Sequence, residues 1–374
     1  MKPRERVLRT LDHEEPSMVP WYSAVDPRIF GIEGPSVGSI FKRDLADSSV
    51  MDPGSEAFGR RLKAQLDIVR MLDSEFMTVS VLSDPRNNRM IDEEHYVNEW
   101  GRIFSTKLIG GISDAYIGGY LTTPEKYREF TRNRPPPLSD WRLNSIRETK
   151  KLARENDLFL LGGAGSIVEI VMEAVGIPNF CRYLYTDPAF IDEIIRDSAL
   201  WTLEIGGAMA DEGLDGVLIF DDYAFQSGPI FSVKHFRRHV LPWVKRVVSE
   251  LRHKGLRVFQ HSCGDIRLLM EDIVGAGYEA IEPLETTAGV TIGEMKEKWG
   301  DRITLIGNVS LNTLVSGTPE ETAKETEECI RTGAPGGGYM LGASHNIYYG
   351  CKPENVLAMS LSRKRYGKYP MTNS

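Results

Sequence analysis

The amino-acid sequence predicts a (β/α)8 barrel, and two features of its pattern carry this prediction. Eight short runs of apolar, branched residues alternate with longer helical patterns, which is typical of parallel strands joined by right-handed crossovers. Eight such units favour a closed barrel over an open doubly wound sheet, and no G-x-G-x-x-G motif follows a strand. The expected strands are Met18–Tyr22, Phe76–Leu82, Leu158–Leu161, Gly216–Phe220, Leu256–Gln260, Glu279–Glu282, Ile303–Ile306 and Gly338–Leu341.

The helical patterns fall between these runs, and the clearest of them has an apolar face with i, i+3 and i+4 spacing. This face begins at Phe190 and continues through Ile194 in the longest of the patterns. The expected helices are Arg4–Leu11, Pro188–Glu212, Val233–Lys254, Ile266–Ala276, Ile292–Trp299 and Glu320–Thr332.

One long polar region, Asp84–Ser139, interrupts the alternation after the second expected strand. It contains two Gly-Gly pairs and the run Pro135-Pro136-Pro137, which are turn signals. We expect an insertion that forms a hairpin or a lid over the barrel mouth, and a linker between domains is the alternative. The whole chain, 1–374, is expected to be one barrel domain that contains this insertion.

Composition excludes several classes of protein. A net charge of −8 and the absence of a dominant Lys/Arg cluster argue against a nucleic-acid partner. No apolar run approaches the roughly 18 residues of a membrane span, and the N-terminus lacks the apolar core of a signal peptide. The cysteines are few and scattered, which indicates reduced thiols and a cytoplasmic location.

Polar residues follow the expected strands at their carboxyl ends, where parallel barrels build their active sites. Each residue alone is a weak signal, but the convergence of His, Cys and carboxylate side chains at one end of a barrel is more informative. The candidate site residues are Trp21, Tyr22, Asp84, Asp221, Asp222, Tyr223, Gln226, His261, Cys263, Glu282, Glu285, Asn308 and His345.

His261 and Cys263 are the most specific pair among these residues. Residues i and i+2 of an extended segment point the same way, so an imidazole and a thiolate could reach one Zn2+. A third ligand must come from another strand, and Glu282, Glu285 and His345 are the candidates, of which we favour Glu282. The alternative is that Cys263 is a small buried apolar residue in a chance H-x-C pair.

Two residues are candidates for catalysis, and the others are candidates for substrate binding. Asp222 could orient a ligand or accept a proton, and His345 follows a glycine-rich strand whose backbone could approach a ligand closely. One aspartate of Asp221-Asp222 could instead be a cap while the other is solvated. The expected substrate-binding residues are Trp21, Tyr22, Asp84, Asp221, Tyr223, Gln226 and Asn308.

The remaining histidines and cysteines are expected to be structural. His235 and His239 are four apart on an expected helix, a spacing that can bind metal, but no glutamate lies between them. We therefore expect both on an exposed helix surface. Cys181, Cys329 and Cys351 have no partners at ligand spacing.

Several motifs together resemble the uroporphyrinogen decarboxylase superfamily over nearly the whole chain. The matching segments are Arg4–Leu8, His13–Pro16, Val19-Pro20, Asp221–Gly228, His261–Asp265, Leu305–Val309, Gly336–Tyr339, Ser344-His345 and Pro353–Asn355. The resemblance implies a barrel enzyme of one of two branches.

The first branch comprises corrinoid-dependent methyltransferases, which move a methyl group between a methylated small molecule or a thiol and a corrinoid. The resemblance implies a zinc site of the form H-x-C…C, in which His261 and Cys263 match the first two ligands. The third cysteine is absent, and His345 or a carboxylate, as in related O-demethylase components of anaerobes, would replace it. No D-x-H-x-x-G segment is present, so the corrinoid is expected on a separate partner protein.

The second branch comprises metal-free decarboxylases of porphyrin biosynthesis, which hold a tetrapyrrole's carboxylates with an arginine-rich N-terminal loop. Bidentate cations suit such a substrate, but the corresponding stretch, Val19–Arg28, has a single arginine. We therefore favour a zinc-assisted methyltransferase, with a carboxy-lyase and a non-catalytic ligand-binding protein as alternatives. Related barrels often form dimers, so a homodimer is also expected.

Overall fold

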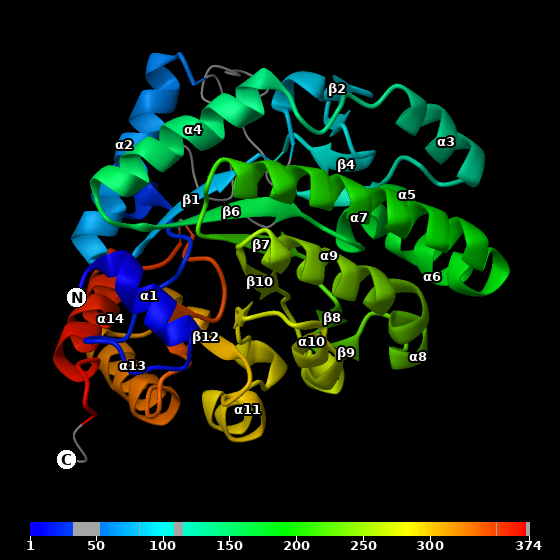
Figure 1. Cartoon of the computed structure of the whole chain (residues 1–374). Helices are drawn as coiled ribbons and strands as arrows, with labels where there is room; N and C mark the ends of the chain where they lie inside the picture. Colours follow the sequence, from blue (N-terminus) through cyan, green and yellow to red (C-terminus); the bar gives the residue numbers. More distant parts are fainter. Residues whose placement is uncertain (33–52, 82, 108–114, 349, 372–374) are drawn as a thin grey trace.

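A curled sheet of seven parallel strands forms the centre of the molecule in a computed structural model (Figure 1). The structure describes residues 1–32, 53–81, 83–107, 115–348 and 350–371. The strands lie side by side in chain order, as the βα alternation predicts. They are β1 (Phe76–Ser80), β6 (Phe159–Gly165), β7 (Gly216–Phe220), β10 (Arg257–His261), β11 (Ala280–Glu282), β12 (Thr304–Val309) and β13 (Tyr339–Ala343).

This arrangement confirms the (β/α)8-type fold class, although the first expected strand is not a regular one. The segment Met18–Tyr22 makes an isolated parallel bridge from Trp21 to Leu341 of β13 instead of a continuous ladder. On its β1 side, the Trp21 N–H donates to the carboxylate of Glu75 at 2.8 Å. Between the N-terminal segment and β1, which we call the seam of the barrel, a side-chain hydrogen bond therefore takes the place of main-chain hydrogen bonds between strands. The end of the second expected strand, Leu82, lies outside the described residues.

Helices surround the sheet, and the first of them covers the end where the strands begin (Figure 1). Val7 and Leu11 of α1 pack in one buried cluster with Phe76, Phe159 and Phe259 of the strands. Apolar side chains therefore fill the barrel at the amino-terminal ends of its strands. A functional site is then expected at the carboxyl ends of the strands. The helices are α1 (Pro3–Leu11), α2 (Glu56–Leu72), α3 (Pro124–Arg132), α4 (Asp140–Glu155), α5 (Glu169–Val175), α6 (Ile177–Thr186), α7 (Pro188–Asp211), α8 (Val233–His235), α9 (Leu241–His253), α10 (Met270–Ala276), α11 (Ile292–Trp299), α12 (Leu311–Ser316), α13 (Pro319–Gly333) and α14 (Pro353–Tyr366).

One expected helix is divided in the structure. The pattern over Val233–Lys254 predicts a single helix, but a π-helical turn, η4 (Phe236–Val240), separates α8 from α9. Pro242 has no N–H group, so it cannot donate the hydrogen bond that a continuous α-helix requires at this point.

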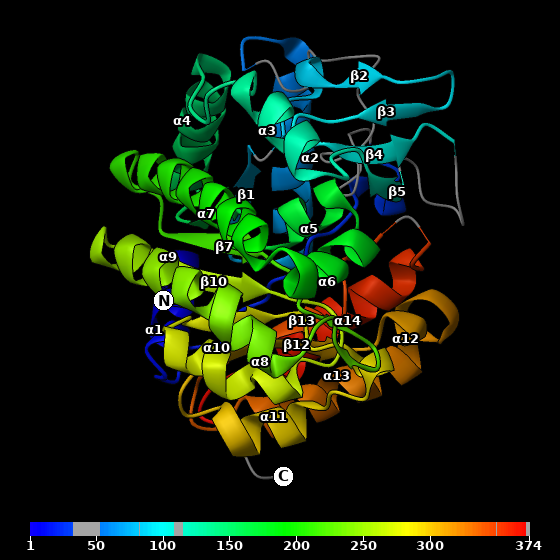
Figure 2. The same cartoon turned by 90° about the vertical axis from the view of Figure 1, so that its right-hand side faces the viewer.

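The region 84–139 contains an antiparallel sheet that lies beside the barrel (Figure 2). It is anchored on α5, where Arg102 forms a 2.9 Å ion pair with Glu173 and the Leu121 N–H donates to the carbonyl of Ala174 at 2.9 Å. The short strands are β2 (Arg89–Met90), β3 (His95–Val97), β4 (Arg102–Ser105) and β5 (Tyr116–Gly119).

A smaller hairpin, formed by β8 (Ala224–Phe225) and β9 (Gly228–Pro229), follows β7. Within the part of the chain that the structure describes, every helix is too short or too polar to cross a membrane.

Candidate metal centre at the barrel mouth

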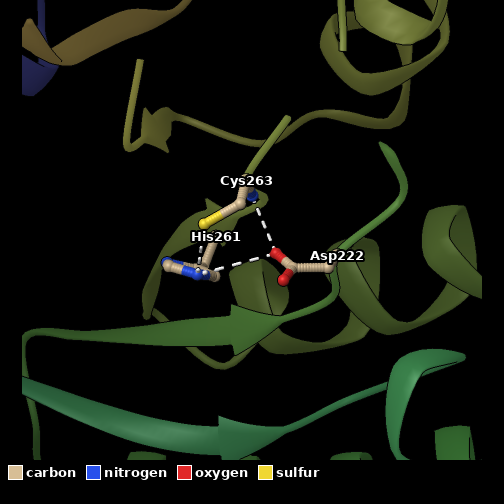
Figure 3. Close-up of side chains that lie close together, drawn as sticks. All are labelled: Asp222, His261 and Cys263. Atoms are coloured by element: carbon tan, nitrogen blue, oxygen red, sulfur yellow. Dashed lines mark hydrogen bonds and ion pairs between the residues drawn. The ribbon is translucent and has the colours of Figure 1, made fainter. Parts of the chain in front are cut away.

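His261, Cys263 and Asp222 converge at the carboxyl ends of two neighbouring strands (Figure 3). His261 is the last residue of β10, and Asp222 follows the end of β7. The His261 Nε2 atom lies 3.7 Å from the Cys263 sulfur and 3.7 Å from an oxygen of Asp222. The three potential ligand atoms all lie within 4.8 Å of one another.

Three carboxylates hold the segment that carries this pair. Asp222 accepts a hydrogen bond from the Cys263 N–H at 2.7 Å, and Glu285 accepts one from the Gly264 N–H at 2.7 Å. Glu282, at the end of β11, lies 2.7 Å from Nδ1 of His261. The orientation of the imidazole and of the segment after it is therefore set by carboxylates from the adjacent strand ends.

These carboxylates also determine the protonation of the two central side chains. Burial works against a charged imidazole, but Glu282 and Cys263 raise the pKa of His261 well above its usual range. Burial raises the pKa of the Cys263 thiol to about 11 and outweighs the lowering effect of His261, with smaller raising contributions from Asp222 and Glu285. Both side chains therefore carry protons in the metal-free protein at neutral pH.

The donor set fits a divalent transition metal ion. Imidazole, thiolate and carboxylate are the ligands that Zn2+ prefers in proteins, and three protein ligands are typical of a catalytic zinc site. Among the described residues, Asp222 and Glu282 form ion pairs only with His261, so a protonated His261 is the one basic side chain that pairs with these two carboxylates. A bound divalent cation would offset the carboxylate charge in its place.

The structure gives Asp222 and Glu282 different relations to His261. Asp222 lies on the Nε2 side together with Cys263, whereas Glu282 contacts Nδ1. A carboxylate on the far nitrogen of a histidine ligand fixes its tautomer and its orientation. Asp222 thus lies on the same side of the imidazole as the Cys263 sulfur, and Glu282 lies on the other side; the expectation that Glu282 is a ligand stays a prediction.

Asp221 and Tyr223, both expected to bind substrate, lie in the core. The Asp221 carboxylate accepts hydrogen bonds from the Ser166 hydroxyl at 2.6 Å and from three successive N–H groups, those of residues 167–169, at the start of α5. The Tyr223 hydroxyl donates to the same carboxylate at 3.2 Å. Asp221 thus caps a helix that begins in the loop after the neighbouring strand.

Three other residues expected to bind substrate make contacts within the protein. Asp84 is buried and forms a 2.7 Å ion pair with Arg86. The Asn308 amide donates to the carbonyl of Leu284 at 2.7 Å, which fixes the loop after β11. Gln226, exposed at the β8–β9 hairpin, donates to the Thr287 hydroxyl at 3.3 Å.

Trp21 and Tyr22 line a cavity of about 150 Å3 that extends to His261 and Glu282. Its walls come from the N-terminal segment, α2 and the first strands, and most of the lining side chains are apolar. Burial, reinforced by Glu282, raises the pKa of the Tyr22 hydroxyl well above its usual range. This cavity is a candidate substrate pocket next to the metal-ligand cluster.

His345, the second expected catalytic residue, is not a member of the metal-ligand cluster. It is exposed, and among the described residues the metal-ligand cluster contains only Asp222, His261 and Cys263. Its neighbour Asn346 reaches the cavity wall.

The expectation that His235 and His239 lie on an exposed helix surface was wrong for His239. This residue is buried, and its Nδ1 atom lies 2.6 Å from an oxygen of Asp192. The cause is the packing of η4 and α9 against α7, which carries Asp192. The expectation that the other three cysteines are structural stays a prediction, and Cys329 and Cys351 are buried free thiols.

Glu169 is a residue near the cluster that the sequence analysis did not identify. It begins α5, and its carboxylate accepts a 2.9 Å hydrogen bond from the Asp222 N–H. Burial, together with Asp222 and Glu173, raises the pKa of Glu169 well above its usual range. The sequence feature that could have pointed to Glu169 is its place after the glycine-rich end of β6, in the run Gly162–Glu169.

The structure places this protein in the class of parallel βα barrels, with a His, a Cys and several carboxylates at the barrel mouth. Comparison with known families identifies its family. Residues 111–366 match the family model for uroporphyrinogen decarboxylase (URO-D). This range is more than half of the chain, so the protein belongs to the uroporphyrinogen decarboxylase family, as its motifs predicted.

Curated relatives carry two different names. The uroporphyrinogen decarboxylase of Pelodictyon phaeoclathratiforme is 25% identical over 228 residues, covering 57% of this chain and 61% of the relative. The methylcobamide:CoM methyltransferase MtaA of Methanosarcina barkeri is 24% identical over 229 residues, covering 60% of this chain and 64% of the relative. The matches thus span less than two thirds of the length of these relatives, and both relatives are named as enzymes.

A solved structure of a methyltransferase from Methanosarcina mazei has the same fold. It superimposes with a TM-score of 0.72 and 18% sequence identity, and the match covers 98% of this chain and 99% of the other. At this identity the likeness shows a shared fold.

Proposed function

We propose that this protein is a methyltransferase of a corrinoid-dependent system. It would move a methyl group between a methylated small molecule or a thiol and a corrinoid that a separate protein carries. The observation that carries the proposal is the cluster of His261, Cys263 and Asp222 at the barrel mouth. The relatedness to a methylcobamide:CoM methyltransferase supports it.

Zinc is the metal that this cluster fits best. Nε2 of His261, the Cys263 sulfur and an oxygen of Asp222 would hold the ion, while Glu282 keeps the proton on Nδ1 of His261. A bound zinc ion supplies Lewis-acid chemistry, which lowers the pKa of a thiol or makes the oxygen of a methyl ether a better leaving group.

The protein's own residues would bind the small molecule and exclude water from it. The cavity that reaches His261 is enclosed by Trp21 and Tyr22 and has mainly apolar walls. An apolar cavity of about 150 Å3 accommodates a ligand of the size of benzene. The corrinoid is much larger, so it would approach from the barrel mouth on its partner protein.

Tetrapyrrole decarboxylation is the second candidate, because decarboxylases are as similar to this chain as the methyltransferases are. One observation argues against it. The single arginine of the N-terminal stretch, Arg28, forms a 2.7 Å ion pair with Asp26 of the same stretch.

Metal analysis and a methyl-transfer assay test the proposal together. Protein purified without chelator is expected to contain close to one equivalent of zinc, and less than about a tenth of an equivalent, with no gain on titration, would reject the zinc site. The assay offers methoxylated and methylamine donors with free cob(I)alamin and measures methylcobalamin. Release of carbon dioxide from uroporphyrinogen, without methyl transfer from any donor, would establish the decarboxylase instead.

A further inference from the structure

The loops after β6 and β7 hold each other through two reciprocal contacts. Asp221, in the loop after β7, accepts a 3.0 Å hydrogen bond from the backbone N–H of Glu169. In return the Glu169 side chain accepts a 2.9 Å hydrogen bond from the backbone N–H of Asp222. Two hydrogen bonds therefore link Glu169 to the consecutive residues Asp221 and Asp222, and we call these three residues the Asp–Glu clasp.

The clasp is one of the contacts that hold the backbone around Asp222, together with a 3.0 Å hydrogen bond from the Gln260 amide to the Asp221 carbonyl. Asp221 is fully buried, so one side of Asp222 is already fixed. With its own N–H held by Glu169, the carboxylate of Asp222 is directed at the Cys263 N–H, 2.7 Å away, and at Nε2 of His261, 3.7 Å away. Without Glu169, the Asp222 N–H would lose its acceptor, and the Asp221–Asp222 peptide would be held at its carbonyl but no longer at its N–H.

We propose that Glu169 is a positioning residue that holds Asp222 in place to serve as the third metal ligand. The inference rests on the proposed function for the metal itself, but the contact between Asp222 and Cys263 tests the positioning role without any metal. Residues that orient metal ligands typically contribute about 10- to 100-fold to metal affinity.

The variants follow from the chemistry of the contact. Glu169→Ala removes the acceptor, whereas Glu169→Gln keeps a carbonyl oxygen that can accept from the Asp222 N–H. Glu173→Gln is the matched control, because Glu173 lies one turn further along α5 and pairs with Arg102 rather than with Asp222.

Cobalt(II) titration, followed by its visible absorption, is the first measurement. We expect Glu169→Ala to weaken Co2+ binding by about tenfold or more, and Glu169→Gln and Glu173→Gln to stay within about twofold of the parent protein. Parental affinity in Glu169→Ala, or an equal loss in Glu173→Gln, would overturn the proposal.

Hydrogen exchange of the Cys263 amide in the metal-free protein is the second measurement. Asp222 protects this amide in the structure, so Glu169→Ala is expected to exchange it faster while Glu169→Gln does not. If the parent protein binds no Co2+, the zinc proposal fails, and the exchange rate alone decides the role of Glu169. Unchanged exchange at Cys263 in Glu169→Ala would show that the clasp does not position Asp222.

Discussion

Nδ1 of His261 lies 2.7 Å from Oε1 of Glu282, across the ends of two neighbouring parallel strands. The register places these two residues directly opposite each other. Because the carboxylate contacts Nδ1, it is Nε2 that faces Cys263 and Asp222, and the loss of the Nε2 proton would make this nitrogen available to a metal. One contact between strands therefore decides which nitrogen is available to a metal.

Replacing Glu282 tests this relationship. Glu282→Gln removes the charge that favours an Nδ1 proton, so zinc affinity is expected to fall by about 10-fold or more. Competition with a chromophoric chelator measures the affinity. Glu294→Gln serves as control, because Glu294 pairs with Arg267 and Lys298 rather than with a member of the cluster, and it should bind zinc as the parent protein does. Equal affinity in all three proteins would refute the orienting role of Glu282.

Metal affinity should rise with pH. The pKa of His261 is raised by Glu282 despite its burial, and burial raises that of Cys263 to about 11, so both ligands are protonated in the metal-free protein at neutral pH. The metal binds the deprotonated forms, so protons compete with it below these pKa values and cease to compete above them. Between about pH 6.5 and pH 8.5 the affinity for Co2+ should increase by up to tenfold per pH unit for each proton displaced. A flat profile would contradict this ligand assignment.

Asp222 and His345 are expected to differ in their effect on the metal. Asp222→Ala removes a candidate ligand and the acceptor of the Cys263 N–H, and should reduce bound zinc well below one equivalent. His345 is exposed and lies outside the cluster, so His345→Ala should keep the parental zinc content. Metal analysis of both variants therefore shows whether Asp222 or His345 is the third ligand. Zinc loss in His345→Ala alone would reverse the assignment.

The sequence predicted the strands well because each is a short, mostly buried run in a parallel sheet. Seven of the eight expected runs overlap strands of the curled sheet, and Gly216–Phe220 has the same bounds in both. The eighth, Met18–Tyr22, differs because Glu75 bonds the Trp21 N–H with its side chain. No periodicity in the sequence reports such a contact, since its partners are 54 residues apart.

The site was predicted in its location but less well in its contacts. The spacing of His261 and Cys263 brought both to one strand end, because i and i+2 share a face. Which carboxylate faces which nitrogen depends on three-dimensional register, so the sequence could not separate Asp222 from Glu282. Asp221 and Asp222 are adjacent in sequence, yet one caps α5 and the other faces the cluster.

The buried charges at the barrel seam should make a large contribution to stability. Glu75 is fully buried, pairs with Arg6 at 2.8 Å and with Arg363, and accepts the Trp21 N–H. Glu75→Ala leaves two arginines without this partner, so we expect the free energy of unfolding to fall by about 3–5 kcal/mol. Urea denaturation measures it.

The control for this variant is an exposed ion pair at the surface. Asp157→Asn removes the contact to Lys2, whose side chain is 70% exposed, and should change stability by less than about 1 kcal/mol. If Glu75→Ala unfolds at the same urea concentration as Asp157→Asn, the N-terminal segment is not held by Glu75.

The antiparallel sheet should behave as a fixed wall of the barrel mouth, and two adjacent glycines test this. A Cβ atom on Gly119 would lie 2.3 Å from the backbone nitrogen of Gly176 and 2.5 Å from the carbonyl oxygen of Ala174, next to α5. A Cβ atom on Gly118 would meet no atom of the described residues within 4 Å. Gly119→Ala must therefore push the sheet away from α5, at a cost of about 1–3 kcal/mol, whereas Gly118→Ala should have little effect.

Limited proteolysis and hydrogen exchange over residues 89–119 measure this docking. We expect faster cleavage and exchange in Gly119→Ala, and parental rates in Gly118→Ala. Because Arg102 of the sheet pairs with Glu173 of α5, displacement of the sheet should also speed exchange at the start of α5, near Glu169. If both variants keep parental rates, the sheet is free to move relative to α5 and the region 84–139 acts as a lid.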